Sequence, residues 1–180
     1  MRIVVGISGA SGIPYAVRFL ENLRGHDTYL VISEAAKKVI QYESDENIEY
    51  IRSLASHNYE DDDFSAPISS GSFLFDSMVI VPCSITTISK IAAGISDTLI
   101  TRAAAVSLKE RRRLIVVPRE MPLSTIDLKN MTYLSENGVI VAPASPGFYT
   151  KPKSVDDMVA FVVSRILDLV GVGNDLIKRW

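Results

Sequence analysis

The chain has 180 residues, of which 47% are hydrophobic and 22% are charged, a balance typical of a globular domain rather than of a disordered segment. A formal charge of -2 gives no electrostatic indication of nucleic-acid binding. One cysteine excludes an internal disulfide framework and a zinc ribbon, and two histidines disfavour a histidine-rich metal site. We therefore expect a single domain over residues 1–180, located in the cytoplasm, with no bound metal, membrane-spanning segment or cleaved leader.

Short apolar runs alternate with segments of helical spacing. The runs are continuous in Val and Ile, which is typical of parallel strands covered on both faces. The alternation predicts an α/β fold, a doubly wound layer with a mostly parallel sheet. Residues 58–77 are expected to be irregular, with the acidic run at 60–63 as a solvated loop. In chain order the expected elements are a strand over 2–8, a helix over 13–23, strands over 29–33 and 78–82, a helix over 98–111, a strand over 114–118, a helix over 123–136, a strand over 139–143 and a helix over 155–170.

A glycine-rich turn, GISGASG at 6–12, follows the first strand. It lacks the Gly-Lys-Ser/Thr of a Walker loop, and its glycine spacing differs from the dinucleotide-binding fingerprint. Glycines let backbone amides approach an anion, and Ser8 and Ser11 add hydroxyl groups at a helix N-terminus. The turn therefore either binds a ligand or only joins a strand tightly to a helix.

A second hydroxyl-rich segment, PCSITT at 82–87, follows the strand over 78–82. Its hydroxyls either cap the next helix or bind a ligand, because open α/β sheets bind ligands beyond the carboxyl ends of their strands. The strand ends at residues 8 and 82 would face the same crevice. Cys83 fits a small buried residue better than a nucleophile, because no histidine lies near it in sequence.

Charged and aromatic residues follow the two last predicted strands. Arg119 and Glu120 lie between two prolines; they form either a surface ion pair or a site in which Arg119 binds phosphate and Glu120 moves a proton. Tyr149 is either a packed loop aromatic or a hydroxyl donor to phosphate. Lys109 and Arg165 would by default be solvated helix residues.

Taken together, these segments resemble the UbiX-type flavin prenyltransferases, within the wider group of homo-oligomeric flavin-containing decarboxylase-like proteins. The resemblance covers nearly the whole chain in the family's order. The matching segments are GISGASG at 6–12, SGSF at 70–73, PCSITT at 82–87, SDTLITRAA at 96–104, LKERR at 108–112, VPREMPL at 117–123, FY at 148–149 and DDMV at 156–159.

The resemblance implies a flavodoxin-like Rossmann layer assembled into a homo-oligomer, usually a dodecamer. It implies a reaction that joins the dimethylallyl group of dimethylallyl phosphate to N5 and C6 of reduced FMN. The product, prenylated FMN, would serve a partner UbiD-type decarboxylase. The chemistry suits the composition, because ionising an allylic phosphate needs cations on the departing oxygens and a water-poor pocket, both available without a metal.

The resemblance also implies roles for individual residues. Glu120 is implied as the acid–base residue, with Ser11 and Glu43 also at catalytic positions. The sequence departs from many relatives at Ile85-Thr86, where they have Met-Lys, so the finer contacts there differ. FMN contacts are implied for Gly9, Ala10, Ser11, Ser33, Ser84, Ile85, Thr86, Thr87 and Arg119. Contacts with the prenyl substrate are implied for Arg102, Lys109, Arg119, Tyr149, Arg165 and Trp180.

Two alternatives stay open. A flavin-dependent cysteine decarboxylase of the same superfamily resembles this chain, but that group has a histidine just before the central strand and PASANT after it, where this chain has PISSGS and PCSITT. His57 lies well upstream of the first of these positions. A flavin-binding or storage module without catalysis is the other alternative.

Overall fold

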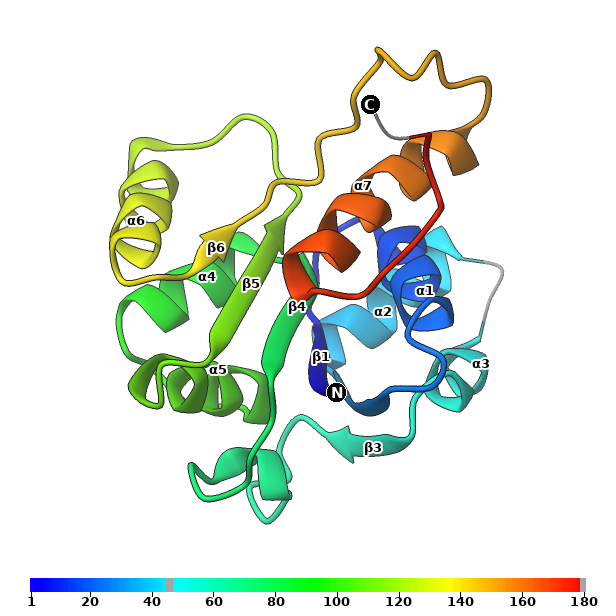
Figure 1. Cartoon of the computed structure of the whole chain (residues 1–180). Coiled ribbons are helices and arrows are strands. Elements are labelled where there is room, and N and C mark those ends of the chain that lie inside the picture. Colours follow the sequence, from blue (N-terminus) through cyan, green and yellow to red (C-terminus); the bar gives the residue numbers. More distant parts are fainter. Residues whose placement is uncertain (45–46, 179–180) are drawn as a thin grey trace.

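The computed structural model describes residues 1–44 and 47–178, so Trp180 lies outside the described residues (Figure 1). Six parallel strands form one sheet in the order β3-β2-β1-β4-β5-β6. Without β3, the remaining five strands have the order of the flavodoxin fold. The strands are β1 Arg2–Ile7, β2 Asp27–Ile32, β3 His57–Glu60, β4 Ser77–Cys83, β5 Arg113–Pro118 and β6 Ile140–Val141.

Helices cover both faces of the sheet. Helices α1, α2, α3 and α7 pack on one face, and α4, α5 and α6 pack on the other (Figure 1). Within the described residues, none of the helices has the length and apolar character needed to cross a membrane. The helices are α1 Ile13–Glu21, α2 Glu34–Glu43, α3 Ile48–Ser53, α4 Ile85–Ala92, α5 Leu99–Lys109, α6 Thr125–Glu136 and α7 Val155–Val170, with a short 3-10 helix, η1, at Pro67–Ser69.

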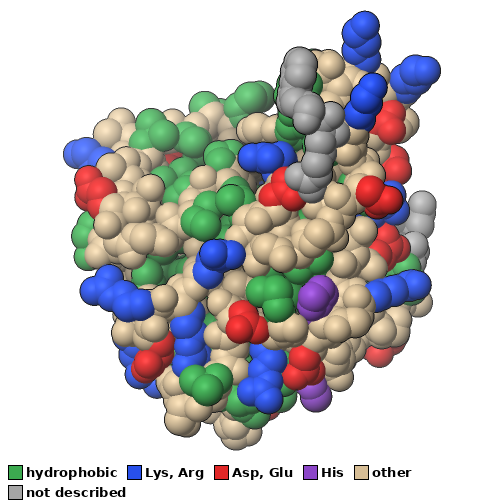
Figure 2. Space-filling view, viewed as in Figure 1, with side chains coloured by type: hydrophobic (Ala, Val, Ile, Leu, Met, Phe, Trp, Pro, Cys, Tyr) green, Lys and Arg blue, Asp and Glu red, His purple; other side chains and the backbone are tan. Residues whose placement is uncertain are grey.

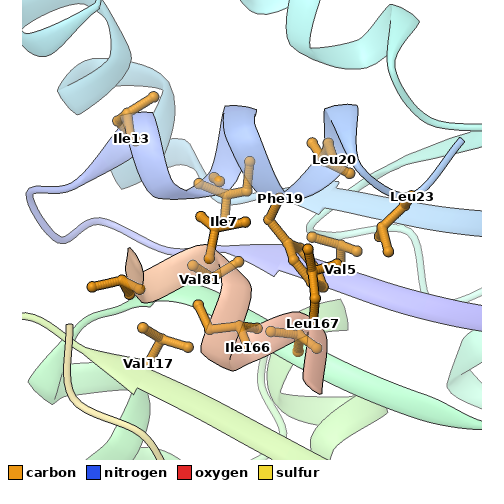
Figure 3. Close-up of a cluster of buried hydrophobic side chains, with 14 of the residues drawn as sticks. Val5, Ile7, Ile13, Phe19, Leu20, Leu23, Val81, Val117, Ile166 and Leu167 are labelled. Atoms are coloured by element: carbon orange, nitrogen blue, oxygen red, sulfur yellow. The ribbon is translucent and has the colours of Figure 1, made fainter. Parts of the chain in front are cut away.

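The continuous apolar runs are explained by this double cover. In β1, Val5 and Ile7 point into the cluster beneath α1 and α7, whereas Val4 points to the opposite face. Figure 3 shows the first cluster, where Phe19 of α1 and Leu167 of α7 meet the strand side chains. Each such fully buried side chain contributes about 1.5–3 kcal/mol, so both faces hold the sheet in place.

The sequence-based expectations for the α/β fold and the five main strands are confirmed, and the sheet is wholly parallel. The expectation for 58–77 was wrong in part, because β3 continues the sheet to Glu60. Helices α2 and α3 were not predicted, and α4 was expected only as the helix that the segment at 82–87 would cap. The chain order reverses between β1 and β4, and in open α/β sheets ligands bind beyond the carboxyl ends of strands at such a reversal.

Candidate functional site

A cavity of ≈ 520 Å³ lies at the carboxyl ends of β1, β2 and β4. The N-terminal residues of α2, α4 and α5 all contribute to its wall. Each helix N-terminus carries partial positive charge and backbone N–H groups, so this convergence favours an anionic ligand. The lining residues are Gly9, Ser33, Glu34, Ala35, Asp61, Asp62, Ser84, Thr86, Thr87, Lys90, Asp97, Thr98, Ile100 and Thr101.

A buried hydroxyl joins the two strand ends beside the cavity. Ser8 Oγ donates to the carbonyl oxygen of Pro82 at 3.1 Å and accepts from the backbone N–H of Ser84 at 2.7 Å. Ser8 is 2% exposed, so its hydroxyl serves the protein, whereas the sequence suggested a ligand donor. The contact fixes the turn after β1 against the turn after β4.

Two serines serve both as helix caps and as cavity wall. Ser33 Oγ accepts from the backbone N–H of Ala36 at 3.1 Å, and Ser84 Oγ accepts from that of Thr87 at 3.2 Å. The capping interpretation of the segment at 82–87 is therefore confirmed. Both serines also line the cavity, so capping fixes hydroxyl groups that face the ligand space.

Gly9 is required by close packing at the cavity wall. A Cβ atom at this position would lie 2.5 Å from Cβ of Ala35, the second residue of α2. Real Cβ atoms do not approach so closely, so any larger residue would push α2 away from the turn. The glycine-rich turn thus lets α2 reach the cavity.

Ser11, Glu43 and Arg119 form a cluster at the N-terminus of α1. The Glu43 carboxylate accepts from the backbone N–H of Gly12 at 2.8 Å and from the Ser11 hydroxyl, and Arg119 Nε donates to the Ser11 carbonyl oxygen at 3.3 Å. Burial alone would raise the pKa of Glu43, but these hydrogen bonds and the nearby Arg119 charge together hold its pKa below the usual value. The anion at this helix N-terminus is therefore the protein's own carboxylate.

Part of the cavity wall is acidic. Asp61 Oδ1 accepts from the backbone N–H of Ile100 at 3.0 Å and so caps α5, and burial raises its pKa. The acidic run at 60–63 is thus not simply a solvated loop. Lys90 Nζ lies 2.7 Å from Asp97 Oδ2. In the described part of the chain, no three His, Cys, Asp or Glu side chains are grouped so that they could hold a metal ion.

Four of the expected prenyl-substrate residues lie away from this cavity in one chain, each with a partner of its own. Arg102 Nε donates to the Ser69 carbonyl oxygen at 2.9 Å, and Lys109 Nζ lies 3.0 Å from Glu110 Oε1. Lys109 is two helical turns beyond the cavity-lining part of α5, about 12 Å along the helix axis. On the face shown in Figure 2, Lys and Arg side chains are spread among acidic ones and form no single basic patch.

The remaining two lie near α7. Arg165 Nη1 is 3.3 Å from Asp168 Oδ2, with an Arg165 side chain that is 61% exposed. The Tyr149 ring packs edge-on against Phe161, with centroids 5.6 Å apart, and lines a separate cavity with Lys151. One chain therefore does not bring these residues to Ser84.

The loop after β5 carries Glu120 on the surface. The Glu120 carboxylate accepts from the backbone N–H of Met121 at 3.1 Å. Among the described residues, no ion pair joins Arg119 to Glu120, so the surface-pair interpretation is not supported. Cys83 is fully buried, and burial raises the pKa of its thiol far above the usual value, which confirms that it is not a reactive nucleophile.

The geometry thus defines a flavodoxin-like protein with an anion-accepting cavity at its switch point, and comparison with known proteins agrees. The profile of the Flavoprotein family matches residues 1–167. The flavin prenyltransferase UbiX of Methanocaldococcus jannaschii is 51% identical over 100% of this chain and 98% of its own length. The corresponding Archaeoglobus fulgidus protein is 47% identical over 100% of both chains. The chain therefore belongs to the UbiX-type flavin prenyltransferases of the flavoprotein family.

Solved structures show the same fold. A dodecameric FMN-dependent UbiX-like decarboxylase from Escherichia coli has a TM-score of 0.98 at 45% identity, covering 100% of this chain and 99% of its own. AnUbiX, in complex with FMN and dimethylallyl pyrophosphate, has a TM-score of 0.98 at 42% identity, covering 99% and 96%. The peptidyl-cysteine decarboxylase EpiD, at 20% identity and a TM-score of 0.67, shares the fold alone, so the decarboxylase alternative is not favoured.

Proposed function

We propose that this protein transfers the dimethylallyl group of dimethylallyl phosphate to reduced FMN, with bonds formed at N5 and C6 and phosphate released. The observation that carries the proposal is the cavity where three helix N-termini meet, in a chain of this family. A volume of ≈ 520 Å³ lies within the range of small-molecule sites. When bound, reduced FMN would supply the electron-rich ring positions, N5 and C6, which attack the electrophilic prenyl group.

The flavin site we propose uses the turn after β1 and the start of α4. Gly9 lines the cavity, and Ala10 and Ser11 follow it in the same turn. Ser33, the N-cap of α2, adds a hydroxyl. Because Glu43 already occupies the N-terminus of α1, we assign the flavin phosphate to the N-terminus of α4, which has no acidic residue in its first turn. The contributing residues of α4 are Ser84, Ile85, Thr86 and Thr87.

The prenyl phosphate needs cations and a proton donor. Arg119 donates to the carbonyl oxygen of Ser11, in the turn that follows β1, and is proposed as a cation for the prenyl phosphate. Glu120 in the same loop is proposed as the acid–base group. Within that site Ser11 and Glu43 orient Arg119. The separation of the remaining substrate residues supports a site completed by other copies, in a homo-oligomer that we propose to be a dodecamer, as in the Escherichia coli relative. The separated residues are Arg102, Lys109, Tyr149 and Arg165. The proposed site also includes Trp180, which lies outside the described residues.

Three further elements belong to the same proposal. Residues 1–180 act as one flavoprotein domain, in keeping with a family match over residues 1–167. Prenylated FMN passes to a UbiD-type decarboxylase, since the product is a cofactor that this chain itself does not use. The reaction takes place in the cytoplasm, a location that rests on the family resemblance.

The proposal is tested by anaerobic incubation of the protein with reduced FMN and dimethylallyl phosphate, followed by mass spectrometry of the extracted flavin. We expect a flavin heavier than FMN by one prenyl unit. FMN that binds but stays unmodified would instead indicate a binding module. Loss of carbon dioxide from a peptide with a C-terminal cysteine, without a new flavin, would indicate the cysteine decarboxylase. A requirement for a divalent ion would contradict the metal-independent reaction.

A further inference from the structure

The charges around the flavin cavity are unbalanced. Its wall carries four carboxylates, those of Glu34, Asp61, Asp62 and Asp97. Of the lining residues in the described part of the chain, Lys90 is the one cation. Flavin phosphate is an anion, and like charges across a partly enclosed cavity oppose its binding. Some positive group must offset this repulsion, because helix N-termini supply only partial charges.

The position of Lys90 on α4 places its charge beside the proposed phosphate site. Lys90 lies four residues after Thr86, and residues so spaced are neighbours on one helix face. Both residues line the cavity. Position 86 is a threonine, so Lys90 is the cation that this face of α4 presents to the cavity.

A competing partner holds Lys90 in the ligand-free cavity. Its Nζ atom lies 2.7 Å from Asp97 Oδ2, in a contact between side chains that are 33% and 50% exposed. A pair so exposed to solvent is held weakly. A phosphate oxygen therefore competes with Asp97 for the ammonium group, and charge-assisted hydrogen bonds to phosphate are among the stronger ones.

We propose that Lys90 is a binding residue for the flavin phosphate and is released from Asp97 when the ligand enters. The proposal rests on the proposed function, because it requires the flavin to occupy this cavity. It makes Lys90 a determinant of selectivity for FMN over riboflavin, which has the same ring and no phosphate.

The test compares dissociation constants for FMN and for riboflavin, measured by calorimetry on the full chain. Lys90→Met keeps the length of the side chain and removes the charge. We expect its dissociation constant for FMN to rise about tenfold, with that for riboflavin changed less than about twofold. Lys129→Met on α6, away from the cavity, is the matched control and should change neither constant.

Two further variants distinguish the loss of the positive charge from a structural effect of the Lys90 substitution. Thr86→Lys added to Lys90→Met should restore most of the FMN affinity, because the charge returns to the same helix face. Asp97→Asn in the otherwise unaltered chain should tighten FMN binding, because Lys90 loses its competitor. Equal weakening of FMN and riboflavin by Lys90→Met, or no change in either, would overturn the proposal. A chain that binds neither ligand before substitution would overturn the proposed function and this inference with it.

Discussion

The flavin cavity and the surfaces that carry the prenyl-substrate residues are built in different ways. At the cavity, one chain brings the ends of β1, β2 and β4 and three helix N-termini to a single place. The proposed substrate residues Lys109, Tyr149 and Arg165 lie on separate surfaces, each against a neighbour of its own. The difference is expected if the proposed flavin site needs only the fold of one chain, whereas the proposed prenyl site needs the assembly of several copies.

The largest expected effect concerns Glu120, the proposed proton-transfer group on the exposed loop after β5. Glu120→Gln should keep FMN affinity and slow single-turnover prenylation by about 10²–10⁴-fold, because its neutral isostere cannot exchange a proton. Rapid-quench measurements at saturating FMN give the rate constant. Glu136→Gln at the end of α6 removes the same charge elsewhere and should react normally. An unaltered rate constant in Glu120→Gln would show that this carboxylate only shapes the loop.

A smaller effect is expected from the packing of the cavity wall. Gly9→Ala should lower the free energy of unfolding by about 1–3 kcal/mol, because the new Cβ lies 2.5 Å from Cβ of Ala35. It should also weaken FMN binding, since α2 must shift. Gly173→Ala, which meets nothing within 4 Å, is the matched control and should change stability by less than about 0.5 kcal/mol. Urea unfolding of both variants checks this, and equal stabilities would contradict the close packing.

The smallest expected effect is the pH-dependent contribution of Glu43. Its carboxylate caps α1, and its pKa in the folded chain is lowered, so its stabilisation is present above the unfolded pKa and lost as the pH falls through the folded pKa. At neutral pH, Glu43→Gln should cost about 0.3–1 kcal/mol, allowing for solvent screening of this exposed group. Unfolding measured from neutral to strongly acidic pH should show the two stabilities converge. A constant difference would contradict the charge-based cap.

Much of the fold could be predicted because buried parallel strands have continuous apolar sequences, as Val4 and Val5 show by packing on opposite faces. Strand β3 escaped prediction because His57–Glu60 is a polar edge strand, mostly exposed and paired on one side only. The cap that Asp61 provides for α5 joins positions 39 residues apart, which no local pattern reveals.

Part of the candidate site could likewise be predicted from local sequence, and part depends on contacts that only the fold creates. Ser84 was predictable because it follows β4, which ends at the switch point, whereas Ser33 was implied only by the family resemblance. The place of Lys90 was not, because its pairing with Asp97 depends on how the chain turns between α4 and α5. A basic residue near a helix end usually indicates only a solvated face.

The division between a flavin site in one chain and a prenyl site shared between copies is tested most directly by subunit complementation. Glu120→Gln and Lys109→Met chains, each expected to be nearly inactive alone, are dissociated, mixed in equal amounts and reassembled. If Lys109 acts on the flavin of another copy, random mixing should restore about a quarter of the unaltered activity, because that fraction of sites combines intact groups from two chains. Verified mixed oligomers that stay inactive would show that both groups must come from the same chain, and would contradict the shared site.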